Sequence, residues 1–212
     1  MTLDDLVARA RALASGPGRA VLGITGSPGA GKSTLAEALL GELGPGVAHV
    51  PMDGFHLADV ALTALGRRDA KGAPDTFDVG GYVALLRRLR ADGEDVIYAP
   101  AFERDLEQPL AGAIAVPRAA RLVLTEGNYL LLDSGGWAQV RPLLDEVWFC
   151  APDEGLRLAR LTARHVAFGK DPDHAVSWVA SVDAPNAELV DATRGRADLV
   201  VPAAVLDTIT PR

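Results

Sequence analysis

A glycine-rich segment near the N-terminus has the residue types and the spacing that bind phosphate groups. Residues 23–34 read GITGSPGAGKST, and Gly26 to Ser33 fit the pattern G-x-x-x-x-G-K-[ST]. In such a loop the backbone N–H groups cradle nucleotide phosphates, the lysine reaches the β- and γ-phosphates, and the hydroxyl ligates Mg²⁺. The pattern therefore predicts a nucleotide site, with Lys32 and Ser33 in these two roles. A glycine-rich turn that binds no ligand is the alternative.

The sequence on either side of this loop is typical of a strand and a helix. An apolar run at 20–25 precedes the loop, and leucines at helical spacing over 35–43 follow it. A helix N-terminus offers free N–H groups and the positive end of a dipole to a phosphate. We therefore expect contacts with ATP from Gly26, Ser27, Pro28, Gly29, Ala30, Gly31, Lys32, Ser33 and Thr34. Thr34 is expected on the helix surface or near the base of the nucleotide.

Two acidic residues follow apolar runs that we expect to be strands. VPMDGFH places Asp53 after one run, and RLVLTEG places Glu126 at the end of another. A carboxylate beside the phosphates can accept a proton from an attacking hydroxyl or hold Mg²⁺. We expect Asp53 to be the base and Glu126 to be the metal partner. The two roles could be exchanged, and Asp53 could instead cap the next turn.

Three arginines lie at helical spacing in the last third of the chain. Arg160 and Arg164 lie three and seven residues after Arg157, so all three share one edge of a helix. Arginines on a closing segment can stabilise the charge that develops during phosphoryl transfer. Spacing alone favours a solvated face whose arginines pair with Asp153 and Glu154.

The four histidines show no metal-binding spacing such as H-E-x-x-H. His49, His165 and His174 are expected to be structural or exposed. His56 differs because it lies three residues after Asp53. It is expected either to touch the substrate or to pack or cap locally.

Strands and helices are expected to alternate along the chain. We expect strands at 20–25, 47–52, 95–98, 121–125, 146–150 and 199–201, and helices at 3–13, 35–43, 79–91, 137–144, 153–168 and 175–194. Such alternation predicts the α/β class, with a mostly parallel sheet flanked by helices and ligands bound beyond the carboxyl ends of the strands. Residues 66–78 and 99–117 are expected to be long, irregular, functional insertions.

Length and composition are those of an ordinary globular domain. The chain has 212 residues, of which 49% are hydrophobic, and we expect one domain over 1–212 with an N-terminal helix in 1–19. The net charge of −7 argues against partners such as long nucleic acids or anionic membranes. Cys150 is the only cysteine, which favours a reducing cytoplasm. No apolar run approaches the ~18 residues of a membrane span.

Several separated segments together resemble the uridine kinase and phosphoribulokinase-like branch of P-loop kinases, a group that includes bacterial pantothenate kinase. The segments are GSPGAGKST, VPMDGFHL, KGAPDTFD, YAPAFER, TEGNYLLLD and RLARLTARHVAFGK, and the resemblance spans roughly 20–201. It is closest to bacterial proteins described as nucleoside/nucleotide kinase-like or fructose-transport-kinase-like. The resemblance implies a three-layer P-loop NTPase fold with a helical lid over 153–174.

The resemblance also implies roles for particular residues. It makes Asp53 the base, places Lys32, Arg160 and Arg164 at the transferred phosphoryl group and Arg157 at ATP, and puts Lys170 in the same lid. It places the acceptor near Asp53, near Asp75 or Asp78, and near Tyr98, Phe102 and Arg104. Asp78 could equally cap the helix that begins at Val79. Two departures from uridine kinases are Gly54, where those enzymes carry a second acid or a serine, and YAPAFER, which lacks their aromatic–histidine arrangement.

We therefore expect a kinase that uses ATP and Mg²⁺ to phosphorylate a hydroxyl of a small metabolite, such as a nucleoside, a sugar or a pantothenate-like alcohol. Family analogy permits a homodimer. The alternative is a nucleotide-binding switch or an ATPase without a small acceptor. A GTPase switch would carry an N-K-x-D signal, and neither Asn128 nor Asn186 is followed by lysine.

Overall fold

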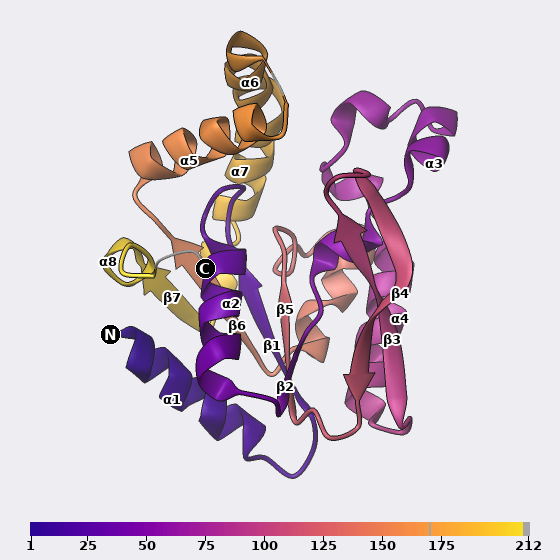
Figure 1. The fold of residues 1–212 in the computed structure, drawn as a ribbon, viewed down its shortest axis with the longest axis vertical. Helices are drawn as coiled ribbons and strands as arrows, with labels where there is room; N and C mark the ends of the chain where they lie inside the picture. The colour runs from indigo at the N-terminus through magenta and orange to yellow at the C-terminus, as the bar shows by residue number, and fades with distance from the viewer. Residues whose placement is uncertain (170, 210–212) are drawn as a thin grey trace.

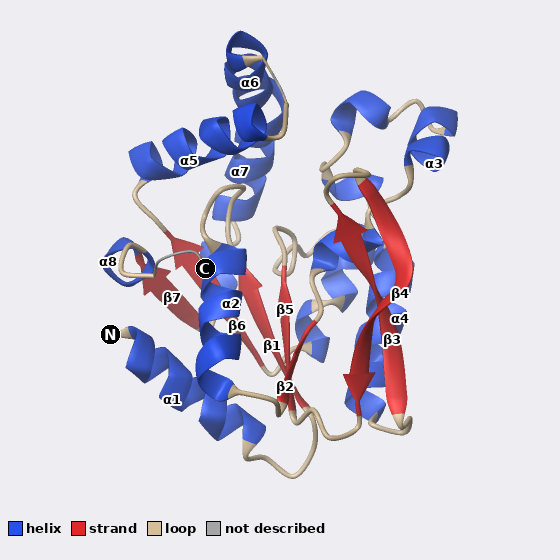
Figure 2. Cartoon of the chain, viewed as in Figure 1, coloured by secondary structure: helices blue, strands red, loops and turns tan. Residues whose placement is uncertain are grey.

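A parallel sheet forms the centre of the protein, as seen in a computed structural model that describes residues 1–169 and 171–209 (Figures 1 and 2). Its five strands are β1 (Ala20–Thr25), β2 (Val47–His49), β5 (Leu122–Glu126), β6 (Glu146–Ala151) and β7 (Leu199–Pro202), in the order β2-β5-β1-β6-β7. Every adjacent pair is parallel. The predicted mostly parallel sheet is confirmed, and all its carboxyl ends lie at one edge.

Residues of each strand alternate between two apolar cores, one on each face of the sheet. The helices that cover these faces are α1 (Leu3–Ala14), α2 (Lys32–Leu43) and α4 (Val79–Ala91). Leu22 and Ile24 of β1 pack with α1 and α2, whereas Val21 packs with α4 on the other face. Because successive strand residues point to opposite faces, one continuous apolar run serves both layers. The sheet is therefore covered by helices on both faces, which gives the predicted three layers (Figure 2).

A β-hairpin lies apart from the central sheet. It consists of β3 (Val96–Glu103) and β4 (Gln108–Pro117), which pair antiparallel and pack against α4 and the 3₁₀ turn η1 (Met52–Phe55). The strand predicted at 95–98 is present as the start of β3, but its place in the parallel sheet was predicted wrongly, and the irregular structure predicted over 99–117 was wrong. β4 is rich in alanine and glycine, which are poor strand signals.

Helices extend beyond the carboxyl edge of the sheet where the lid was expected (Figure 1). They are α5 (Glu154–Ala167), α6 (Pro172–Trp178), the π-helical turn η6 (Val179–Asp183) and α7 (Ala184–Asp191). The helix predicted over 175–194 is thus interrupted. Pro185 has no N–H to donate to the carbonyl group of Ser181, so a regular α-helical bond is missing there. Lys170 lies outside the described residues.

The remaining elements are short. They are α3 (Asp59–Ala64), η2 (Arg68–Ala70), η3 (Pro74–Thr76), η4 (Gly135–Gln139), η5 (Arg141–Leu143), η7 (Arg194–Arg196) and α8 (Ala203–Leu206). The helix predicted at 137–144 was wrong, because two 3₁₀ turns replace it and Pro142 lies in the second. In the part of the chain that the structure describes, no helix is both long enough and apolar enough to cross a bilayer.

Candidate active site

The carboxyl edge of the sheet opens into a cleft of about 430 Å³. Its walls come from the glycine loop after β1, from α5 to α7, and from the hairpin together with the segment that follows α3. The cleft brings together ten of the predicted site residues: Pro28, Gly29, Lys32, Ser33, Asp53, His56, Phe102, Arg104, Glu126 and Arg164.

The glycine loop has the conformation that a phosphate cradle needs. Gly26, Gly29 and Gly31 have φ angles of +149°, +81° and +83°, a region that residues with a side chain rarely adopt. A Cβ on Gly26 would stand 2.8 Å from the carbonyl oxygen of Cys150. Helix α2 begins directly after the loop, and no side chain caps it and no acid lies in its first turn. Its free N–H groups therefore fit a bound phosphate.

Contacts with the neighbouring helices hold the glycine loop in place. Ala30 is buried beneath it. Ser27 Oγ donates a hydrogen bond to Asp191 Oδ1 at 2.6 Å, which ties the loop to α7. Arg157 of α5 is buried, and its Nη1 donates to the carbonyl oxygen of Pro28 at 2.7 Å. The loop is therefore braced from α5, which lies in the predicted lid, and from α7.

Lys32 lies beneath the loop as a buried cation. Its side chain is 8% exposed, and Nζ donates to the carbonyl oxygens of Gly26 and Ser27 at 3.0 and 3.1 Å. Burial lowers the pKa of Lys32, and the nearby carboxylates of Glu126 and Asp53 oppose that shift. A lysine in this position can reach phosphates in the loop.

Glu126 contacts the hydroxyl group of Ser33 at the start of α2. Ser33 Oγ donates to Glu126 Oε1 at 3.0 Å. Burial raises the pKa of Glu126, the charge of Asp53 raises it further, and Lys32 opposes both effects. No group of three His, Cys, Asp or Glu side chains that could hold a metal occurs among the described residues. A hydroxyl and one carboxylate suit Mg²⁺, which takes its other ligands from phosphate and water.

Asp53 and Arg104 lie near each other on the hairpin side of the cleft. Asp53 is in η1, directly after β2, and its side chain is 33% exposed. Arg104 Nη2 lies 3.8 Å from Asp53 Oδ2, and the same guanidinium lies 5.9 Å from the ring centre of Phe168 at the end of α5. Arg104 thus links the hairpin side of the cleft to the lid side.

The three arginines of α5 have different environments. Arg164 lines the cleft and makes no ion pair among the residues that the structure describes. Arg164 is exposed to solvent in the cleft. Partial burial by the cleft walls lowers the pKa of Arg164, and the nearby charge of Arg104 lowers it further. Arg160 points elsewhere and pairs with Asp207 at 3.1 Å. Arg157 pairs with Glu154 at 2.6 Å, a pairing that spacing alone suggested, but it is buried and not on a solvated face.

Several known proteins are similar to this chain in sequence and in fold. No family model matches the chain. It is 37% identical over 190 residues to "Uncharacterized protein YggC" of Escherichia coli K12, covering 86% of this chain and 77% of that protein. It is 30% identical over 217 residues to "Putative uridine kinase C227.14" of Schizosaccharomyces pombe, covering 97% of this chain and 92% of that protein. The chain belongs to the uridine kinase-like group of P-loop kinases.

A solved structure agrees with this assignment. The "putative fructose transport system kinase" of Silicibacter sp. TM1040 is 35% identical, with a TM-score of 0.86, and the match covers 95% of this chain and 100% of that one. The P-loop kinase is therefore an ATP-dependent small-molecule kinase, a phosphotransferase.

Three predicted acceptor residues of the P-loop kinase are not in the lining of the cleft. Arg67 Nη2 donates to Asp75 Oδ1 at 2.8 Å. Asp78 caps α4 by accepting from the backbone N–H of Gly81 at 2.8 Å, the capping role that the sequence left open. Tyr98 is 59% exposed on β3. Asp75 therefore pairs with an arginine, Asp78 caps a helix, and Tyr98 is exposed.

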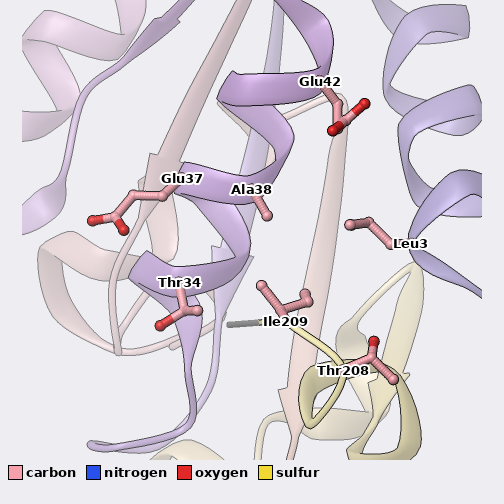
Figure 3. Close-up of a pocket in the computed structure, with 7 residues that line it drawn as sticks. All are labelled: Leu3, Thr34, Glu37, Ala38, Glu42, Thr208 and Ile209. Carbon is pink, nitrogen blue, oxygen red and sulfur yellow. The ribbon is translucent and has the colours of Figure 1, made fainter. Parts of the chain in front are cut away.

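Thr34 lies in a different and smaller hollow of the P-loop kinase. This hollow is lined by the outer face of α2, by Leu3 of α1, and by Thr208 and Ile209 near the C-terminus (Figure 3). The hydroxyl of Thr34 is therefore on the helix surface, one of the two positions expected for it.

Sequence inspection missed several residues that line the cleft. They include Asp59, Arg68, Lys71, Phe77, Glu107, Asn128, His165, Asp183 and Asn186. Lys71 and Phe77 stand in the KGAPDTFD segment and His165 in the lid segment, so these motifs carried a signal. Asp183 carried none, because it reaches the cleft from the π-helical turn, where Asp183 Oδ2 lies 2.7 Å from His165 Nε2.

Proposed function

We propose that this kinase transfers the γ-phosphoryl group of ATP to an alcohol group of a small metabolite, with Asp53 as the general base. One observation supports this most strongly: a single cleft holds the glycine loop, the buried Lys32, the Ser33–Glu126 pair and the carboxylate of Asp53. These are the groups that bind a triphosphate and activate a hydroxyl.

The donor side of the cleft would hold ATP and its metal ion. The glycine loop and the first turn of α2 bind the phosphates, and Lys32 turns from the loop carbonyls to the β- and γ-phosphates. Ser33 and Glu126 would hold Mg²⁺. When bound, Mg²⁺ would offset the negative charge of the phosphates.

Proton transfer would take place on the side of the cleft that carries Asp53. The acceptor hydroxyl gives its proton to Asp53 as its oxygen bonds to the γ-phosphorus. The bond from that phosphorus to the β–γ bridging oxygen breaks, and ADP leaves with the electron pair. Arg164 and Arg104 lie on the cleft wall, where they can offset the charge on the transferred oxygens.

The names of the relatives support a small alcohol as the acceptor. They refer to uridine kinase, pantothenate kinase and D-glycerate 3-kinase. We propose a nucleoside, a sugar or a pantothenate-like alcohol for this chain.

A panel of hydroxyl compounds tests the proposal. ADP release from MgATP should rise with at least one of uridine, D-fructose, pantothenate and D-glycerate. Asp53→Asn should retain ATP binding and lose about 10²–10⁴-fold in kcat with the active compound. Asp69→Asn, a change at an exposed aspartate of the neighbouring segment, is the control. Release that no compound stimulates would favour a switch or an ATPase, and normal turnover in Asp53→Asn would remove the base.

A further inference from the structure

The ring of His56 is held in one orientation beside the proposed base. Its centre lies 4.1 Å from the ring centre of Phe77 and 4.8 Å from that of Phe102. The backbone of His56 also forms an antiparallel bridge with that of Phe77. His56 Nδ1 lies 2.8 Å from the carbonyl oxygen of Asp53. Two aromatic contacts and one hydrogen bond therefore restrain this ring.

The hydrogen bond determines which ring nitrogen carries the proton. A carbonyl oxygen can only accept, so Nδ1 must be the protonated nitrogen of His56. Burial lowers the pKa of His56, with Asp53 opposing that shift, and the ring is therefore neutral around pH 7. In a neutral imidazole with a proton on Nδ1, Nε2 keeps its lone pair and can only accept a hydrogen bond.

The lone pair of Nε2 is available to a ligand. His56 lines the cleft. Its Nε2 has no hydrogen-bond partner among the described residues, and it is not one of their buried, unpartnered side-chain atoms. The atom is therefore open to the cleft.

Asp53 and His56 are placed for the same ligand. They are three residues apart along a 3₁₀ turn, and the N–H of His56 donates to the carbonyl oxygen of Asp53 at 3.1 Å. Side chains at this spacing in a 3₁₀ turn lie one above the other. Both side chains line the cleft, so a small molecule can reach both with neighbouring groups.

We propose that His56 Nε2 accepts a hydrogen bond from a second hydroxyl group of the phosphoryl acceptor, next to the hydroxyl that gives its proton to Asp53. The acceptor class is then a neutral polyol, such as a sugar or the ribose of a nucleoside. This inference rests on the proposed function and narrows its substrate.

Two other acceptor classes fit this position poorly. A carboxylate has no proton to donate, so it would face the lone pair of Nε2 with its own lone pairs. Lys71, whose Nζ lies 5.4 Å from the ring centre of Phe102, is already paired with Asp59 at 2.7 Å. A deoxygenated carbon would leave Nε2 without a partner and without water, which costs binding energy.

The protonation state of the ring can be measured without any turnover. In ¹⁵N spectra of histidine-labelled protein, the signals lost in His56→Phe identify His56. We expect a protonated Nδ1 and an unprotonated Nε2 at pH 7. A proton on Nε2 would overturn the inference, whatever the enzyme phosphorylates.

Paired substrates then test the hydroxyl contact. Uridine is compared with 2′-deoxyuridine and 3′-deoxyuridine, D-ribose with 2-deoxy-D-ribose, and D-fructose with its monodeoxy analogues. Loss of the critical hydroxyl should lower kcat/KM of the wild type about 10–100-fold. His56→Phe keeps an aromatic ring between Phe77 and Phe102. In this variant, removing the same hydroxyl from the substrate should lower kcat/KM less than about threefold. His174→Phe, at an exposed histidine of α6, should behave like the wild type.

The outcomes separate this inference from the proposed function. Equal losses in the wild type and in His56→Phe would overturn the hydroxyl contact while phosphoryl transfer still stood. Loss of turnover in His56→Phe with every acceptor, deoxy compounds included, would instead make His56 part of the proton transfer. ATP turnover that no acceptor raises would overturn the proposed function and this inference together.

Discussion

Ser33 Oγ donates a hydrogen bond to Glu126 Oε1 at 3.0 Å, although 93 residues separate the two in the sequence. The contact exists because β1 and β5 are adjacent parallel strands, with Ile24 opposite Glu126. The segments that follow the two strands therefore meet at one edge of the sheet.

Glu126→Gln should weaken metal binding more than nucleotide binding. The amide keeps the size of the side chain and loses the charge that Mg²⁺ prefers. We expect the Mg²⁺ concentration for half-maximal turnover to rise by about 10–100-fold. A titration of kinase activity with Mg²⁺ at saturating ATP measures this. Glu188→Gln, at an exposed glutamate of α7, is the matched control. An unchanged Mg²⁺ dependence would assign the metal to another carboxylate, with Asp53 the first candidate.

Arg164→Gln should slow phosphoryl transfer far more than Arg160→Gln. Arg164 lines the cleft, whereas Arg160 pairs with Asp207 on the outside of α5. We expect a fall in kcat of about 10²–10³-fold for Arg164→Gln. For Arg160→Gln we expect less than about threefold, because exposed ion pairs contribute little. Single-turnover rates with a bound acceptor separate transfer from product release. A larger effect at Arg160 would mean that α5 rotates when ATP binds.

Gly54→Ala should displace the hairpin from the turn that carries Asp53. A Cβ at Gly54 would stand 2.3 Å from the carbonyl oxygen of Pro100 in β3. This contact explains why glycine occupies the position where uridine kinases carry an acid or a serine. We expect a loss of about 1–3 kcal/mol in the free energy of unfolding, measured by urea denaturation, together with reduced activity. Gly18→Ala, whose Cβ would meet nothing within 4 Å, should leave both unchanged. Wild-type stability in Gly54→Ala would show that the hairpin moves freely.

His49 should make the protein less stable as the pH falls. Burial lowers the pKa of His49 from 6.5 to about 4. The unfolded chain therefore binds a proton before the folded one does, so this contribution to stability is complete above pH 6.5 and is lost as the pH falls towards 4. The loss amounts to about 3 kcal/mol at most.

Urea denaturation of the wild type and of His49→Phe between pH 7 and pH 4.5 tests whether His49 lowers the unfolding free energy as the pH falls. The variant should show a shallower fall of the unfolding free energy with decreasing pH. His174→Phe, at an exposed histidine, should keep the slope of the wild type. Parallel slopes for the wild type and His49→Phe would place the acid sensitivity at other groups.

Local spacing was sufficient to predict the segments that form the glycine-loop side of the cleft. The glycine loop, the flanking strand and helix, and the acids after two strands are encoded within short segments. The bounds of β1 and α4 agree with those expected, 20–25 and 79–91. Such features could be predicted because the period of apolar residues and the requirement for glycine at positive φ act over a few neighbouring residues.

Packing between distant segments decided the acceptor side. Arg157, Arg160 and Arg164 share an edge of one helix, yet one braces the loop, one pairs with Asp207, and one lines the cleft. The orientation of the His56 ring likewise depends on two rings brought from Phe77 and Phe102. No local pattern encodes these outcomes, because the direction and partner of a side chain depend on which surfaces meet when the sheet, the hairpin and the lid pack together.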